Sequence, residues 1–255
     1  MAAREDRGTE AMAVGSGAGE EKSYLRDVLD KRGLGSTRRL LLRILERHRD
    51  LFGDSILEVG AGMPDFLLRV PVPRRAALDV EPYYADSFRE AGIAFHLRDL
   101  DRQDLDDLGP FDIVVCTDVF EHLLHPEKAL ARIQRVMSPK GVLFSHVPNE
   151  FRLGKMLRVM LGREESVYWH ADQPEWGDPH LRRFTDLGYR RFLSLAFRHN
   201  LRLNALKPSR YERPFNRLGL RAPYCLQAGP TYLSTNDAGL AAEFRRRAGR
   251  RARFM

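Results

Sequence analysis

Cysteine is scarce in this 255-residue chain, which contains only Cys116 and Cys225. Two thiols cannot build a disulfide framework or a four-cysteine zinc site, so both are excluded. No apolar run reaches the roughly 18 residues that a membrane-spanning helix needs. The N-terminal residues lack the apolar core of a secretion signal. These absences predict a soluble, cytoplasmic protein with reduced cysteines.

The net charge of +7 comes almost entirely from the C-terminal end. The last eleven residues contain six arginines and no acidic residue, namely Arg245, Arg246, Arg247, Arg250, Arg251 and Arg253. The rest of the chain is nearly neutral, whereas a nucleic-acid enzyme usually carries a basic face on its fold. We therefore expect no nucleic-acid partner. Residues 241–255 are predicted to be a basic tail, either a frayed solubilising end or a weak contact with an anionic surface.

Five short apolar runs are predicted as strands, at residues 55–59, 76–80, 93–97, 111–117 and 142–147. Helical patterns surround them at 21–33, 37–52, 126–137 and 185–199, and a closing strand pair is expected within 201–205 and 224–233. Apolar strands that alternate with helices are typical of a parallel sheet covered on both faces. The sequence therefore predicts an α/β, doubly wound, Rossmann-like fold. It forms one domain over 21–240, after a disordered leader at 1–20 and with a lid-like insertion at about 150–184.

A glycine turn follows the first predicted strand, with the sequence Glu58-Val59-Gly60-Ala61-Gly62. Two glycines let the backbone turn tightly and approach a ligand closely. Pro64 is expected to begin the next helix. Asp79 lies 19 residues past Gly60 at the end of the second predicted strand, where a carboxylate can accept hydrogen bonds from ribose hydroxyls.

Three classes of ligand could explain this turn. A dinucleotide site needs a third glycine, but Asp65 stands at that position and would repel a pyrophosphate. A P-loop needs a Gly-Lys-Ser/Thr triplet, which the chain lacks. A nucleoside without phosphates fits better, and S-adenosylmethionine carries a positive charge that tolerates Glu58 and Asp65.

The chain resembles the class I S-adenosylmethionine-dependent methyltransferases, in the broad group typified by quinone and sugar O-methyltransferases. The matching segments are residues 57–62 (LEVGAG), 78–80 (LDV), 111–123 (FDIVVCTDVFEHL), 126–130 (PEKAL) and 135–143 (RVMSPKGVL). A looser match at 147–149, 161–163 and 180–185 is similar to members found with bacterial sugar and glycan genes. Many members have a glycine where this chain has Pro64, which puts the start of the first helix in question.

The resemblance implies a role for each matching position. Gly60, Ala61 and Gly62 would pass under the methionine part of the cofactor, and Glu58 would orient the turn. Asp79, followed by Val80, would bind the ribose. Asp99 and Leu100 would hold the adenine edge, with Asp101 as a competitor for this role, and Thr117 and Asp118 would line the methyl end.

A hydroxyl acceptor needs a group that takes its proton, and histidine suits a working pH near neutral. His122 is the first candidate because it follows the fourth strand beside Glu121, although this pair could serve only to hold the loop. His180 is the second candidate. His125 is predicted to begin a helix and His146 to lie in a strand. The residues His170, Asp172, Asp178 and His180 fit no defined ligand spacing, so no metal site is predicted.

These observations favour an O-methyltransferase that uses S-adenosylmethionine, yields S-adenosylhomocysteine and acts on a sugar, glycolipid or secondary metabolite. The chain lacks the Asn/Asp-Pro-Pro-Tyr turn and the Pro-Cys pair that mark nucleic-acid methyltransferases. Two alternatives stay open: a cofactor-binding regulatory or partner protein with the same fold, and a nicotinamide-dependent reductase.

Overall fold

The computed structural model describes residues 34–163, 180–206 and 208–249. All the elements below belong to the compact unit that begins at Ser36. The predicted leader at 1–20 and helix at 21–33 lie outside the described residues, and so do both tryptophans, His170, Asp172 and Asp178. In the described part of the chain, no helix is long and apolar enough to cross a membrane.

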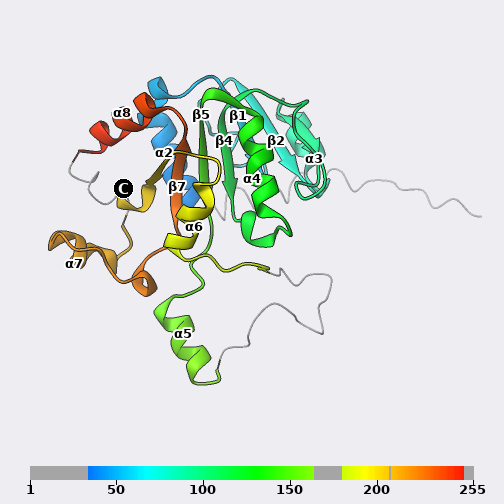
Figure 1. The fold of residues 1–255 in the computed structure, drawn as a ribbon. Helices are drawn as coiled ribbons and strands as arrows, with labels where there is room; N and C mark the ends of the chain where they lie inside the picture. Colours follow the sequence, from blue (N-terminus) through cyan, green and yellow to red (C-terminus); the bar gives the residue numbers. More distant parts are fainter. Residues whose placement is uncertain (1–33, 164–179, 207, 250–255) are drawn as a thin grey trace, which may run out of the picture. The chain divides into compact units, whose positions relative to one another are not determined.

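A seven-stranded sheet forms the centre of this unit (Figure 1). Its strands are β1 (Ser55–Val59), β2 (Arg74–Asp79), β3 (Ala94–Leu97), β4 (Phe111–Thr117), β5 (Met137–His146), β6 (His199–Arg202) and β7 (Thr231–Thr235). The strand order is β3-β2-β1-β4-β5-β7-β6, and only β7 runs antiparallel to its neighbours. This confirms the predicted α/β fold with a mostly parallel sheet.

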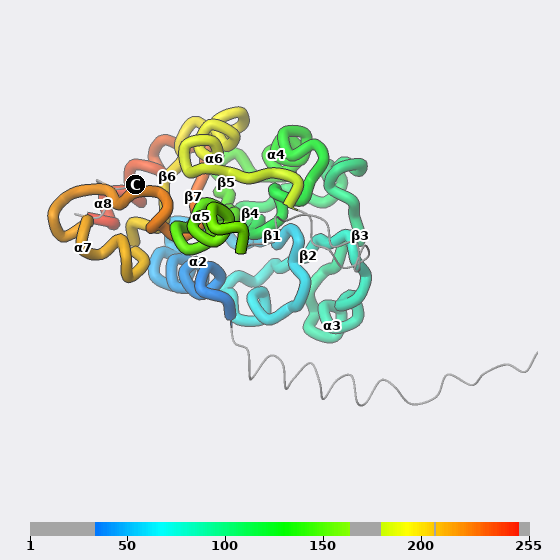
Figure 2. The backbone as a smooth tube through the Cα atoms, turned by 90° about the horizontal axis from the view of Figure 1, so that it is seen from below, coloured from blue at the N-terminus to red at the C-terminus, as the bar shows by residue number. Residues whose placement is uncertain are grey.

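Helices cover both faces of the sheet because the side chains of each strand point alternately to the two sides. On one face, Leu143 of β5 joins a buried cluster with residues of α4 (Pro126–Arg135) and α6 (Asp186–Leu193). On the other face, Phe144 contacts Phe52, which in turn contacts Phe244 of α8 (Ala238–Ala248). Figure 2, which views the strands from their carboxyl ends, shows α2 (Ser36–Arg47) on the opposite side of the sheet from α4 and α6.

Shorter elements complete the unit. They are the helices α3 (Ala85–Glu90), α5 (Leu153–Met160) and α7 (Glu212–Arg217) and the 3-10 turns η1 (Arg49–Leu51), η2 (Phe120–His122), η3 (Leu203–Leu206) and η4 (Tyr224–Leu226). Of these, α5 falls within the predicted insertion at 150–184 and follows the carboxyl end of β5. The described insertion residues therefore lie at the edge of the sheet where parallel α/β proteins bind ligands.

The segment after the glycine turn differs from its prediction. Pro64 does not begin an α-helix, because residues 64–69 form successive turns. Pro71 and Pro73 follow so closely that a regular helix has no room to extend, since proline cannot continue a helix. The end of the next predicted helix also shifts, because α4 ends at Arg135 and β5 begins at Met137.

The basic C-terminal segment also differs from its prediction. Residues 238–248 form α8, so the expected start of a tail at residue 241 falls inside a helix. Phe244 is buried, and Arg247 forms ion pairs with Asp50 and Glu243, each with a nitrogen–oxygen distance of 2.7 Å. The apolar face of this segment packs on the sheet, which the run of arginines conceals in the sequence.

Candidate active site

The glycine turn after β1 has the shape that its sequence predicts. Gly60 and Gly62 have φ angles of +65° and +56°, a region that favours glycine. The Gly60 amide donates a hydrogen bond of 2.8 Å to the carbonyl of Leu78 at the end of β2. A Cβ atom on Gly60 would lie 2.3 Å from Cγ2 of Val119, whereas a Cβ on Gly62 would meet no atom within 4 Å. The turn therefore needs glycine at position 60 and leaves open space at position 62.

Asp79 faces this turn from the neighbouring strand. Its Oδ2 accepts a hydrogen bond of 2.9 Å from the Gly62 amide, and its Oδ1 accepts one of 3.0 Å from the Glu81 amide. Each carboxylate oxygen has a second lone pair for a further donor. Val80, the next residue, is exposed. The structure thus brings the predicted ribose carboxylate against the predicted methionine turn.

Arg38 on α2 is a part of the site that the sequence reasoning missed. Its Nη2 lies 3.0 Å from Oε1 of Glu58 and donates a hydrogen bond of 2.9 Å to the carbonyl of Ala61. Its Nη1 lies 3.5 Å from Oδ1 of Asp65. One guanidinium therefore joins both acids of the turn to its backbone. The sequence did contain a signal for such a residue. Two carboxylates in one buried turn indicate that a cation lies nearby, because buried charges need a partner.

Glu58 is fully buried beneath the turn. Burial raises the pKa of Glu58 to about 8, although the nearby Arg38 guanidinium acts in the opposite direction. Glu58 therefore contacts the turn through Arg38, and the pair holds the turn in place from below.

The two acids after β3 have different hydrogen-bonding partners. Asp101 accepts hydrogen bonds from the amides of Leu124 and His125, at 2.9 and 2.8 Å, and so ties down the loop before α4. Asp99 accepts a bond of 2.9 Å from the Asp101 amide and keeps a partly exposed side chain. Leu100 is buried in the core cluster. Asp99 remains the prediction for the adenine edge, and the burial of its side chain would leave Leu100 only its backbone for the same predicted role.

Thr117 is the last residue of β4, the strand between β1 and β5, and Asp118 follows it directly. Thr117 is buried, while the side chain of Asp118 is 57% exposed. Asp118 has a φ angle of +56°, a conformation that aspartate adopts more readily than most residues. Its amide donates a bond of 3.0 Å to the carbonyl of His146, and its Oδ1 lies 3.6 Å from Nε2 of the same histidine. The Asp118 carboxylate is thereby held at the sheet edge.

The two candidate histidines meet although they are 58 residues apart in the sequence. The rings of His122 and His180 form an edge-to-face pair with centroids 4.8 Å apart. Glu121, which is 1% exposed, joins them, and one potential ligand atom from each of the three residues lies within 4.8 Å of the others. We call these three residues the Glu–His–His cluster. It unites both catalytic predictions in one place.

Two further residues support the cluster, one from the loop after β5 and one from α5. Nδ1 of His180 lies 3.0 Å from Oε1 of Glu150, and Lys155 of α5 forms an ion pair with the same carboxylate. These contacts lower the pKa of Glu150 against the opposing effect of burial. His125 and His146 lie where the sequence predicts them. His125 is half exposed just before α4, and His146 lies in β5 with Nδ1 2.9 Å from Oγ1 of Thr231.

A cavity of about 970 Å³ adjoins the cluster through Glu150. It lies among the residues after β5, α5, residues 209–211 and η4, and four of its lining side chains are basic: Arg152, Lys155, Arg158 and Arg210. None of the predicted site residues lines this cavity or the cavity of about 700 Å³ between α2 and α8. The first cavity is connected to the predicted chemistry only through Glu150, which bonds to His180.

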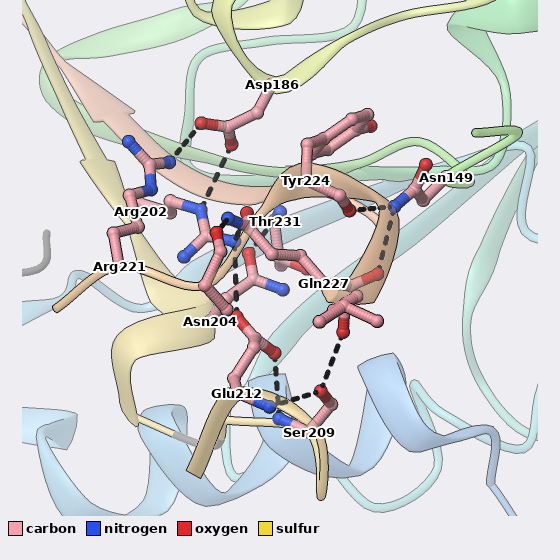
Figure 3. A network of polar contacts seen from close by, with 12 residues as sticks. Asn149, Asp186, Arg202, Asn204, Ser209, Glu212, Arg221, Tyr224, Gln227 and Thr231 are labelled. Atoms are coloured by element: carbon pink, nitrogen blue, oxygen red, sulfur yellow. Dashed lines mark hydrogen bonds and ion pairs between the residues drawn. The ribbon is translucent and has the colours of Figure 1, made fainter. Parts of the chain in front are cut away.

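A buried polar network (Figure 3) adjoins this first cavity through Asn149 and Gln227, which line it. At its centre Arg202, only 4% exposed, bonds to Asp186 at 3.0 Å and to Oε1 of Gln227 at 2.7 Å. The side-chain amide of Asn149 donates bonds of 2.9 Å to the carbonyls of Tyr224 and Gln227. The network attaches η4 and the residue that follows it to β6 and to the loop after β5.

A family model described as a methyltransferase domain matches residues 23–206, most of the chain. The chain belongs to this family. Together with the strand order and the glycine turn, membership makes it a class I S-adenosylmethionine-dependent methyltransferase with a Rossmann-like fold. This assignment replaces the nicotinamide-reductase alternative.

Solved structures share the fold of this methyltransferase at low sequence identity. A methyltransferase from Clostridium acetobutylicum has a TM-score of 0.55 at 10% identity, over 86% of this chain and all of the other. One from Thermotoga maritima, described as a possible histamine N-methyltransferase, has a TM-score of 0.51 at 14% identity, over 85% and 96% of the two chains. The methyltransferase domain of the citrinin polyketide synthase has a TM-score of 0.53 at 14% identity, over 88% and 58%. No curated protein matches the chain.

Proposed function

We propose that this methyltransferase moves a methyl group from S-adenosylmethionine to a hydroxyl of a small-molecule acceptor, either a sugar, a glycolipid or a secondary metabolite. The observation that carries the proposal is the meeting of His122 and His180 after the carboxyl ends of the strands, where Glu150 connects His180 to a large cavity. That end of the sheet also carries the glycine turn and Asp79.

The residues around the turn fit the cofactor. The open space above Gly62 would take the methionine part, and the Asp79 carboxylate beside it would accept the ribose hydroxyls. Asp99 would accept from the adenine edge, and Thr117 and Asp118 would line the methyl end. When bound, S-adenosylmethionine supplies a methyl group already activated on a sulfonium. The protein's main contribution is then alignment, which can supply about 7–11 kcal/mol.

Methyl transfer to a hydroxyl requires that the hydroxyl proton be removed. The acceptor oxygen forms a bond to the methyl carbon while the carbon–sulfur bond breaks and its electron pair stays on sulfur. The hydroxyl proton passes to an imidazole nitrogen, and a base of this kind contributes about 10²–10⁴-fold in rate. His122 is our first candidate and His180 the second. In the simpler alternative, Glu121 and His122 only hold the loop after β4.

The lining of the cavity supports a proposal about the charge of the acceptor. Its four basic side chains outnumber the one acidic side chain, Glu150, that lines it. Because opposite charges attract most strongly where water is partly excluded, we propose that the acceptor carries a phosphate or a carboxylate.

Two measurements test the proposed function. Calorimetric titration of the full chain with S-adenosylmethionine, S-adenosylhomocysteine and NADH should give binding only with the first two. Incubation with sugars, sugar phosphates and aromatic acids, followed by mass spectrometry, should give an O-methylated product. Cofactor binding with no transfer to any acceptor would favour the regulatory protein instead. Methylation of nitrogen would refute the hydroxyl assignment.

His122→Ala tests the base. It should slow turnover and leave the affinity for S-adenosylhomocysteine unchanged. Full activity of the variant would move the proton acceptor to His180, whose alanine variant is the next measurement.

A further inference from the structure

We propose that the Glu–His–His cluster binds one divalent transition-metal ion. A carboxylate oxygen and two imidazole nitrogens are the ligands of many catalytic zinc and non-haem iron sites. This donor set suits such ions better than magnesium, which prefers oxygen ligands alone. The site itself is independent of the proposed function, whereas its catalytic role rests on it.

The three ligand atoms are almost close enough for one ion. Oε1 of Glu121 lies 3.9 Å from Nε2 of His122, and the ligand atoms of all three residues lie within 4.8 Å of one another. At bond lengths of about 2.1 Å, tetrahedral ligands are roughly 3.4 Å apart. Closing the remaining distance takes side-chain movements of about 1 Å.

The Glu150 carboxylate orients the ring of His180 for metal binding. Nδ1 of His180 donates to Glu150, which leaves the lone pair on Nε2. Metal-ligating histidines commonly donate their second nitrogen to a carboxylate in this way, because the bond fixes the ring and makes the ligating nitrogen more basic. Lys155 holds the Glu150 carboxylate from its other oxygen.

The backbone holds the two halves of the cluster together. The Arg182 amide donates a bond of 3.1 Å to the carbonyl of Glu121, and the Arg182 side chain bonds to the Leu124 carbonyl. Glu121 lies at the buried side of the cluster, while the side chains of His122 and His180 are 26% and 23% exposed. The cluster thus has a closed side with a carboxylate and an open side toward solvent, as catalytic metal sites do.

A metal ion here changes the task of the histidines. Three protein ligands leave a coordination position in which the acceptor hydroxyl loses its proton to water more readily. A histidine nitrogen that ligates a metal ion cannot also take a proton. The two roles of His122 therefore exclude each other, and metal binding decides between them.

The test measures metal binding without cofactor or acceptor. The full chain is stripped with a chelator, dialysed and titrated with Co²⁺, followed by calorimetry and by the visible absorption that imidazole ligation produces. We expect one equivalent to bind. Glu121→Gln, His122→Ala and His180→Ala should each abolish the absorption band or weaken binding at least tenfold. Glu150→Gln, which acts through His180, should weaken binding about 10–100-fold.

His125→Ala is the matched control. His125 lies three residues from His122 but is half exposed and faces Glu127 at 3.8 Å, so its variant should bind Co²⁺ like the parent. Circular dichroism and thermal unfolding of each variant exclude misfolding as the cause of a loss. The proposal would be overturned if the parent bound no stoichiometric Co²⁺, or if His122→Ala and His180→Ala bound Co²⁺ as tightly as the parent does.

A separate assay distinguishes this proposal from the proposed function. Methyl transfer by the stripped protein should fall and return when Co²⁺ or Zn²⁺ is added. Unchanged transfer by the stripped protein would refute the catalytic role of the metal ion and leave His122 as the base. Co²⁺ binding without transfer to any hydroxyl would instead overturn the proposed function and retain the site.

Discussion

The Asp79 carboxylate is the strongest single test of the cofactor site. In Asp79→Asn the side chain keeps its size and one oxygen but loses its negative charge. The remaining oxygen can still accept from the Gly62 or Glu81 amide, so the turn should survive. The change therefore acts mainly on the ribose hydroxyls that we expect this carboxylate to bind.

The expected loss can be worked from these bonds. A hydrogen bond to a charged group contributes about 1.5–3 kcal/mol. Losing one such bond at the lower value weakens binding about 12-fold, and losing two weakens it about 150-fold. We expect Asp79→Asn to lie in this range and Asp79→Ala at or beyond its upper end, since alanine also releases the two amides.

Calorimetric titration with S-adenosylhomocysteine measures the effect directly. Glu81→Gln is the control, because this neighbouring side chain is exposed and contributes only its backbone amide to Asp79. The control should bind like the parent. An affinity of Asp79→Asn within twofold of the parent would show that the ribose lies elsewhere and would refute the reasoning.

Four further substitutions test the framework of the site. Gly60→Ala places a Cβ 2.3 Å from a valine methyl in a left-handed turn, so urea unfolding should show that the free energy of unfolding falls by about 2 kcal/mol or more. Gly62→Ala, with open space around it, should lower the free energy of unfolding less. Equal losses in the two variants would contradict the contact with the valine. Arg202→Met removes the buried arginine that pairs with the carboxylates of Asp186 and Glu212, although Arg221 still pairs with Asp186. It should lower the free energy of unfolding by about 3–5 kcal/mol, with a loss under 1 kcal/mol as the contrary result. The pKa of Glu58 is raised to about 8 from an ordinary value of 4.5, so its folded form holds a proton that the unfolded form releases, and stability falls as pH rises from about 4.5 through 8. Glu58→Gln should flatten that fall in unfolding measurements across this window, and an unchanged slope would show that Glu58 is ionised in the folded protein.

The amino-acid sequence by itself determined the features that depend on neighbours along the chain. The alternation of apolar runs and helical stripes predicts the parallel sheet, because each element must bury its own apolar side. Gly60 and Gly62 predict the turn, since the residues required by its φ angles lie within the turn itself. Asp79 could be placed because the carboxyl ends of neighbouring parallel strands lie at one edge.

The tertiary structure alone decided which distant side chains meet. Arg38 lies on a helix 20 residues before Glu58, and no local period indicates that its guanidinium reaches the turn. His180 joins His122 and Glu150 only because the chain returns after α5 to the edge of the sheet. Such contacts depend on how whole elements pack. The sequence therefore indicated which histidines to consider, and only the folded chain joined them with Glu121 in one cluster.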